Sequence, residues 1–185
     1  TKWQRDIWGG PYGLEESKVF QIENAFPKKI SGGDEFEQKN FLWPVRQIVM
    51  KNPDVGHYAF SLAQSDNPNI NLDEQRHKRE DLIEVMKKSY AVYLPSLGDI
   101  SPNLILDAVS LEKPFVMSQH TGLYERLKDV GVFVDPLNAK DIKRGILKIL
   151  DDDVYVKYKE RLRAFDYTHT WEEIADEFLG ILERI

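Results

Sequence analysis

Residues 94–108 read LPSLGDISPNLILDA, a stretch that joins an apolar run to a helix. The run at residues 90–94 is apolar nearly throughout, which is typical of a strand buried on both faces of a parallel sheet. Residues 102–111 repeat apolar side chains at helical spacing and leave a polar side. Ser101 is a good N-cap and Pro102 suits the first helical position. The stretch therefore predicts a buried strand, a loop and a helix in succession.

Short apolar runs alternate with amphipathic stretches along the rest of the chain. Further strands are predicted at residues 19–22, 40–43, 114–117 and 130–134, and one short strand at 69–72 inside a polar loop of residues 64–80. Thr170 and Glu173 form a capping box that predicts a last helix running to about Ile185. Strands that alternate with helices predict an α/β fold, a Rossmann-like parallel sheet flanked by helices.

Composition limits the classes of function. The 185 residues are 42% hydrophobic and 30% charged, as in a single globular domain, and no apolar run is long enough to span a membrane. A net charge of −6 argues against a nucleic-acid partner but is compatible with a small anionic ligand. The chain has no cysteine, which excludes thiolate chemistry and fits the cytoplasm. Residues 1–6 carry no signal-peptide pattern, and we expect the gene product to be longer.

Two carboxylates flank the predicted helix start. Asp99 lies in the loop before the helix, and Asp107 lies almost two turns inside it on the polar side. The free amides of Asn103 and Leu104 point out of the positive helix end, which binds phosphate. In an open α/β sheet such a turn lies at the carboxyl edge, where ligands bind. Because carboxylates accept charge-assisted hydrogen bonds from vicinal hydroxyls, the arrangement suits a nucleotide sugar.

The stretch resembles the carboxylate-x7-carboxylate signature of the large retaining glycosyltransferase family four, glycosyl transferases group 1. Residues 95–96 match its Pro-Ser before the first acid, and residues 108–114 resemble its Ala-x4-Lys-Pro run. The resemblance implies the donor-binding, C-terminal half of a GT-B fold glycosyltransferase. It also implies that Asp99 contacts the transferred sugar and that Asp107, like Asp99 a glutamate in most of the family, holds the ribose. The residues that it assigns to the phosphates are Ser101, Pro102, Asn103 and Leu104.

Residues 44–52, which read PVRQIVMKN, resemble the Arg-x4-Lys-(Gly/Asn) segment that follows the first strand of this domain in the family. The resemblance places Arg46 and Lys51 at the same sheet edge. Two cations there suit a diphosphate leaving group, because they stabilise the charge that develops on it. Asn52 is expected to cap a helix that starts at Pro53.

Weaker matches follow the strand that ends near Ser118. Gly122 and Glu125 resemble a Gly-x-x-Glu of the family at the next strand-to-helix turn, although a glutamate in a first helical turn is commonplace. His120, in the same turn, is expected to face solvent. None of the histidines has metal-ligand spacing, so we expect no metal and no cofactor besides the nucleotide-sugar substrate.

The resemblance also divides the chain. It implies a junction at residues 1–17 from an N-terminal acceptor domain outside this sequence, a nucleotide-sugar-binding Rossmann-like domain at 18–168 and a crossing helix at 169–185. Residues 63–91 are short for the two strands expected there.

The resemblance implies a retaining glycosyltransferase of the hexosyltransferase type in glycan, lipid or polysaccharide biosynthesis, which we expect to be inactive as this chain alone. Its donor is a UDP-, GDP- or ADP-linked sugar, and Asp99, Arg46 and Lys51 are the catalytic candidates. A nucleotide-sugar epimerase of the same fold and a non-catalytic nucleotide-sugar-binding module remain as alternatives. We expect a cytoplasmic protein whose contact with the inner membrane, where there is any, is peripheral and made through the acceptor domain.

Overall fold

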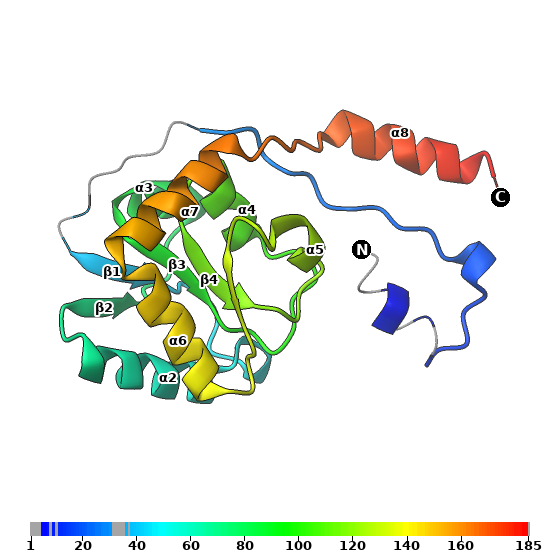
Figure 1. Cartoon of the computed structure of the whole chain (residues 1–185). Helices are drawn as coiled ribbons and strands as arrows, with labels where there is room; N and C mark the ends of the chain where they lie inside the picture. Colours follow the sequence, from blue (N-terminus) through cyan, green and yellow to red (C-terminus); the bar gives the residue numbers. More distant parts are fainter. Residues whose placement is uncertain (1–4, 8, 10, 31–35, 37, 185) are drawn as a thin grey trace.

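A parallel sheet forms the centre of the computed structural model, which describes residues 5–7, 9, 11–30, 36 and 38–184 (Figure 1). Within these residues five strands pair in the order β2-β1-β3-β4-β5. The strands are β1 (Lys39–Leu42), β2 (Ile70–Asp73), β3 (Ala91–Leu94), β4 (Phe115–Ser118) and β5 (Val132–Val134). All pairings are parallel, which confirms the predicted fold class.

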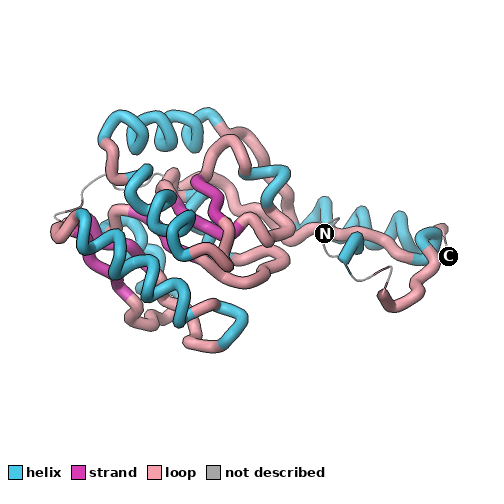
Figure 2. Tube along the Cα trace, turned by 60° about the horizontal axis from the view of Figure 1, so that its bottom comes forward, coloured by secondary structure: helices cyan, strands magenta, loops and turns pink. Residues whose placement is uncertain are grey.

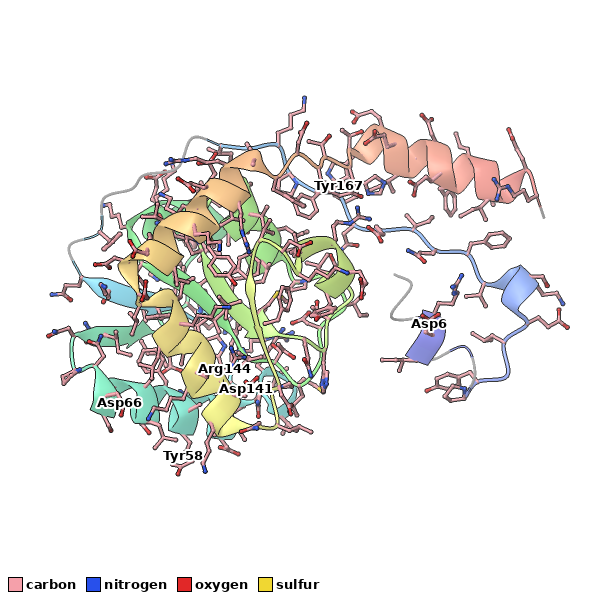
Figure 3. All side chains as sticks on the ribbon, in the orientation of Figure 1. Asp6, Tyr58, Asp66, Asp141, Arg144 and Tyr167 are labelled. Atoms are coloured by element: carbon pink, nitrogen blue, oxygen red, sulfur yellow. The ribbon has the colours of Figure 1, made fainter. Side chains whose placement is uncertain are left out.

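Helices follow the strands and cover the sheet. They are α2 (Pro53–Asp66), α3 (Arg79–Lys88), α4 (Asn103–Ser110), α5 (Tyr124–Leu127), α6 (Ala139–Ile149), α7 (Asp152–Ala164) and α8 (Trp171–Leu182), with 3-10 turns η1 (Glu16–Lys18) and η2 (Val49–Lys51). Helices α2 and α6 lie side by side (Figure 3). An ion pair of 2.7 Å between Lys143 and Asp66 links them. No described helix combines the length and the apolar character needed to cross a bilayer.

The central strands are fully buried, as their continuous apolar runs predict. Every residue of β3 and β4 is buried between helices on the two faces of the sheet. Helix α6 approaches the sheet at Gly145, where a Cβ atom would come within 2.5 Å of a methyl group of Val134. Helix α6 therefore packs too closely on the sheet at this position for any residue larger than glycine.

The predicted strand at residues 19–22 is wrong. These residues lie outside the sheet and form no strand, and Phe26 alone makes an antiparallel bridge, to His169. An apolar run becomes a strand only where another strand offers free backbone groups, and none of the described strands pairs with residues 19–22. The short strand predicted at 69–72 is confirmed as β2, and one strand and one helix, β2 and α3, lie between residues 63 and 91.

The last helix begins with the predicted capping box. Thr170 accepts from the amide of Glu173, and the Glu173 carboxylate accepts from the amide of Thr170. The helix ends at Leu182, and Ile185 lies outside the described residues. Figures 1 and 2 show α8 projecting from the sheet domain with residues 19–25 beside it. No residue of α8 is buried, and Trp171 and Phe178 are exposed to 73% and 52%.

Candidate functional site

The loops after β1 and β3 face each other at the carboxyl edge of the sheet. The chain leaves β1 toward β2 on one side and leaves β3 toward β4 on the other, so the strand order reverses between them. Such a switch point is where open α/β sheets bind ligands. The loop after β1 carries Arg46 and Lys51, and the loop after β3 carries Asp99.

Asn52 fastens these loops together. It is buried in the left-handed conformation (φ 59°, ψ 48°), which asparagine tolerates better than most residues. Its Nδ2 donates to the carbonyl oxygens of Pro95 at 3.0 Å and of Pro136 at 2.8 Å. Asn52 holds the N-cap position of α2, but its side chain makes no capping bond because the side-chain amide is turned toward the loops after β3 and β5. The predicted helix start at Pro53 and the N-cap position of Asn52 are confirmed, while the Asn52 side chain connects two loops instead of bonding to the helix amides.

Lys51 and Asp99 meet at this edge. The Lys51 ammonium donates to the Asp99 carboxylate, and the two side chains are exposed to only 24% and 18%. The Asp99 amide donates to the His120 carbonyl at 3.0 Å, and the Gly122 amide donates to the Asp99 carbonyl at 3.1 Å. A cation and an acid that the sequence places on separate loops thus neutralise each other, with Gly122 directly beside them.

Arg46 is an exposed cation on the same loop as Lys51. Its guanidinium forms no hydrogen bond or ion pair with another residue that the structure describes. An uncompensated arginine at a ligand-binding edge is suited to an anionic ligand, because its fork of N–H donors matches phosphate oxygens.

Helix α4 begins one residue later than predicted. Pro102, with ψ 113°, is the N-cap, and Asn103 is the first helical residue, so the prediction of Ser101 as N-cap is wrong. The extended backbone of Pro102 delays the helix, and no side chain caps it. Ile105 donates to the Pro102 carbonyl at 2.9 Å, whereas the amides of Asn103 and Leu104 have no recorded acceptor in the described part of the chain. Two amides thus remain available at the helix end, as predicted.

Asp107 is held by an arginine that sequence reasoning missed. The carboxylate is buried, with 4% exposure, and both of its oxygens accept from the guanidinium of Arg79, Nη2 to Oδ1 at 2.6 Å and Nη1 to Oδ2. The hydrogen bond to Asp107 raises the pKa of Arg79, which therefore stays charged. Arg79 lies at the start of α3, inside the stretch read as a loop. Its position after β2, at the carboxyl edge, is the signal that could have identified it.

Gly122 and Glu125 border a hollow of about 650 Å³ next to Asp99. The hollow is also lined by Gln119, Thr121, Tyr124 and Arg126, and by residues before β1. Glu125 is exposed and pairs with Lys128 at 2.7 Å. His120, expected to face solvent, is half-buried, and its Nδ1 lies 3.3 Å from the Leu97 carbonyl. The lining is rich in groups that can bond to sugar hydroxyls.

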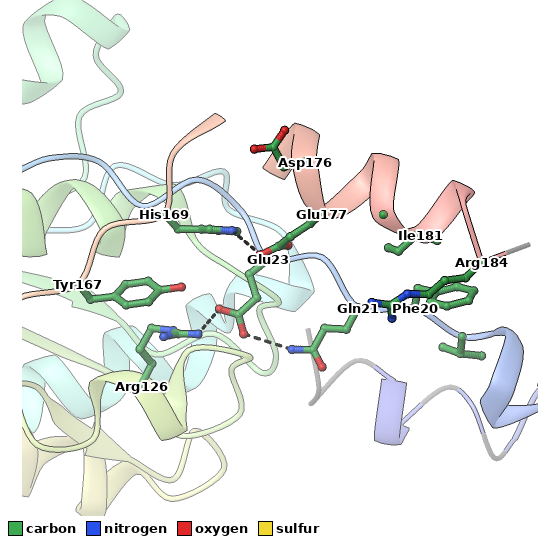
Figure 4. A pocket seen from close by; sticks show the side chains of 12 residues that line it. Phe20, Gln21, Glu23, Arg126, Tyr167, His169, Asp176, Glu177, Ile181 and Arg184 are labelled. Atoms are coloured by element: carbon green, nitrogen blue, oxygen red, sulfur yellow. Dashed lines mark hydrogen bonds and ion pairs between the residues drawn. The ribbon is translucent and has the colours of Figure 1, made fainter. Parts of the chain in front are cut away.

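A second hollow, of about 560 Å³, separates α5 from α8 (Figure 4). Arg126 pairs with Glu23 at 2.5 Å and lies 3.8 Å over the ring of Tyr167. The ring of His169 contacts the Asn24 carbonyl and the Glu177 carboxylate, each at 3.1 Å. Burial lowers the pKa of His169, but these two bonds outweigh it and raise the pKa above its usual value. The cluster fixes the segment before β1 and the start of α8 to the domain.

Lys113, the lysine of the Ala-x4-Lys-Pro run, stabilises the end of helix α3. Its ammonium is buried and donates to the carbonyls of Lys87 at 2.9 Å and Ser89 at 2.7 Å, at the end of α3. Burial lowers the pKa of Lys113 to about 8. The residue therefore caps a helix and does not reach the site. In the described ranges no three His, Asp or Glu side chains converge as metal ligands.

Comparison with known proteins places this geometry in a family. Residues 55–152, more than half of the chain, match the family model of Glycosyl transferases group 1. No curated protein matches the chain in sequence. A mutant form of S. aureus TarM, solved with fondaparinux, alpha-GlcNAc-glycerol and UDP, is similar in structure. Its TM-score is 0.76 at 15% identity, over 97% of this chain and 42% of that one.

Two further solved structures share the fold. The sucrose-phosphate synthase of Thermosynechococcus elongatus matches with a TM-score of 0.65 at 15% identity, over 98% of this chain and 56% of that one. The trehalose-6-phosphate synthase OtsA matches with a TM-score of 0.63 at 12% identity, over 80% of this chain and 44% of that one. The chain thus spans about half the length of these proteins. The matched family model and the observed sheet show that this chain belongs to the glycosyl transferases group 1 family and has the GT-B, Rossmann-like fold.

Proposed function

We propose that this chain binds a nucleotide-diphosphate sugar and forms the donor half of a retaining glycosyltransferase. One observation carries the proposal: the Lys51–Asp99 pair and the exposed Arg46 lie at the same sheet edge as the unpaired amides of the α4 start. Backbone amides at a helix start and two cations form a binding place for a diphosphate. The Asp99 carboxylate beside them is suited to accept hydrogen bonds from the sugar hydroxyls.

Charge explains how the site responds to its ligand. Without ligand, Lys51 and Asp99 neutralise each other. A diphosphate competes for the Lys51 ammonium, and this releases the Asp99 carboxylate to accept hydrogen bonds from the sugar hydroxyls. The sugar would lie in the 650 Å³ hollow that Gly122 and Glu125 border, because Gly122 contacts Asp99 directly.

The reaction then follows from where charge develops. The acceptor oxygen bonds to the anomeric carbon, and the bond from that carbon to the diphosphate breaks, leaving its electron pair on the phosphate. The acceptor proton passes to the leaving phosphate on the same face, which retains the configuration. Arg46, Lys51 and the amides of Asn103 and Leu104 stabilise the growing negative charge. The chain spans about half of the similar structures, and we propose that an acceptor-binding domain completes the enzyme.

Calorimetric titration tests the proposal. The protein is titrated with UDP, GDP and ADP and with the glucose and mannose conjugates of each. UDP is tested first, because TarM was solved with it. We expect one nucleotide to bind and Arg46→Ala to weaken it about tenfold or more, since a hydrogen bond to a charged group contributes roughly 1.5–3 kcal/mol. Lys157→Ala on α7 is the matched control, an exposed cation away from the edge. Failure of every nucleotide to bind would refute the donor site. Conversion of the donor sugar to its epimer by the whole protein, without an acceptor, would instead identify an epimerase.

A further inference from the structure

Arg79 covers the acid that is assigned to the ribose. The two Nη atoms of its guanidinium occupy both oxygens of Asp107 in a bidentate pair. The side chain of Asp107 is exposed to 6% and that of Arg79 to 63%. A ligand that approaches this place therefore meets the guanidinium before it meets the carboxylate.

Arg79 and Asp107 line a hollow of about 490 Å³ together with Asn103, the first residue of α4. Its other walls come from residues 25–28 and 169–172. The volume falls within the range of small-molecule sites in proteins. Since Asn103 also supplies one of the unpaired amides, the hollow begins where the phosphate cradle ends.

The spacing along α4 suits a nucleotide. Asp107 lies four positions after Asn103, which corresponds to about 6 Å of helix rise. That rise is similar to the separation between the 5′-phosphate of a nucleotide and its ribose hydroxyls. A ligand whose phosphates bind the amides at the helix start would therefore carry its nucleoside into the hollow.

We propose that Arg79, and not Asp107 alone, contacts the nucleoside of the donor and is a specificity-determining residue of this site. The inference rests on the proposed function. Two of the five N–H groups of Arg79 bind Asp107, and the others are free to donate to ribose oxygens, while the face of the guanidinium packs on the base. Because Asp107 holds the guanidinium in place, little side-chain entropy is lost when the nucleoside binds.

The test compares Arg79→Met with Arg76→Met, a matched change of an exposed arginine of the same segment that does not line the hollow. Each variant is titrated with pyrophosphate, UDP, GDP and ADP. For Arg79→Met we expect roughly tenfold weaker binding of the nucleotide that the unmodified chain prefers, with pyrophosphate binding unchanged. We expect Arg76→Met to leave both nucleotide binding and pyrophosphate binding unchanged. Arg79→Met with Asp107→Asn removes both charges of the pair and serves where the single variant fails to fold.

The outcomes separate this inference from the proposed function. Equal losses for pyrophosphate and nucleotide would show that Arg79 acts on the phosphates or only on the fold, and would overturn the inference. Unchanged nucleotide binding would overturn it as well. Tighter nucleotide binding by Arg79→Met would show that Arg79 only obstructs Asp107, with the same consequence. No nucleotide binding by the unmodified chain would refute the proposed function itself, whereas the first three results leave it standing.

Discussion

Replacing Asn52 tests how the site is held together. Asn52→Gly removes the hydrogen bonds to the Pro95 and Pro136 carbonyls but tolerates the left-handed backbone. Two buried hydrogen bonds contribute about 1 kcal/mol each, so we expect this change to lower the free energy of unfolding by about 2 kcal/mol. Asn52→Ala loses the same bonds and adds the left-handed strain of a Cβ-bearing residue, about 1 kcal/mol more.

Urea denaturation of the two variants measures the effect. Asn67→Ala is the control, because Asn67 ends α2 at the opposite edge of the sheet and should cost less than about 1 kcal/mol. Loosening the loops should also weaken UDP binding in both Asn52 variants, measured by calorimetry. A smaller loss for Asn52→Ala than for Asn52→Gly would refute the strain argument. A loss below about 0.5 kcal/mol in both would refute the tie between the loops.

Other predictions concern single groups. Burial lowers the pKa of Lys113 from 10.5 to about 8, so the unfolded chain binds more protons in this range and the free energy of unfolding rises with pH. Urea unfolding should show a gain of about 2 kcal/mol between about pH 7.5 and 9.5 that Lys113→Met lacks. Asp99→Asn frees Lys51 and removes a negative charge, so calorimetry should show UDP binding roughly tenfold tighter while sugar transfer by the whole enzyme is lost. Gly145→Ala forces a Cβ to within 2.5 Å of Val134, and thermal unfolding should show a loss of about 1–3 kcal/mol.

The centre of the sheet was predictable because β3 and β4 are short apolar runs. Strands buried on both faces need apolar residues at every position, so β3 and β4 are visible in the sequence without any partner information. Residues 19–22 show the limit of this reasoning. They are as apolar as a strand, yet they run beside α8, away from the sheet, and their backbone finds no strand to pair with.

The position of the candidate site residues at one sheet edge was predictable, but their pairing was not. Loops that follow parallel strands gather at one edge, so Lys51, Asp99 and Asp107 could be assigned to it from their positions after β1 and β3. Lys51 is 48 residues from Asp99, and Arg79 is 28 residues from Asp107. Nothing local in the sequence sets those partners, because they depend on how far each loop reaches. The arginine therefore appeared only in the structure, within a stretch whose polar composition suggested a loop.

The short side chain of Asp107 and its burial beneath Arg79 are connected. Aspartate is one methylene shorter than the glutamate common in the family, and Asp107 is buried beneath Arg79. Because the shorter carboxylate lies beneath the guanidinium that it holds, a ribose in the hollow meets Arg79 before it meets Asp107. If so, Asp107→Glu alone should not improve nucleotide binding, because the longer acid pushes Arg79 outward into the nucleoside's place. Asp107→Glu combined with Arg79→Met should bind nucleotide more tightly than either single variant, and calorimetry over this double-mutant cycle measures the coupling. Additive effects would show that the acid and the arginine act independently, and would contradict the proposal that Asp107 works through Arg79.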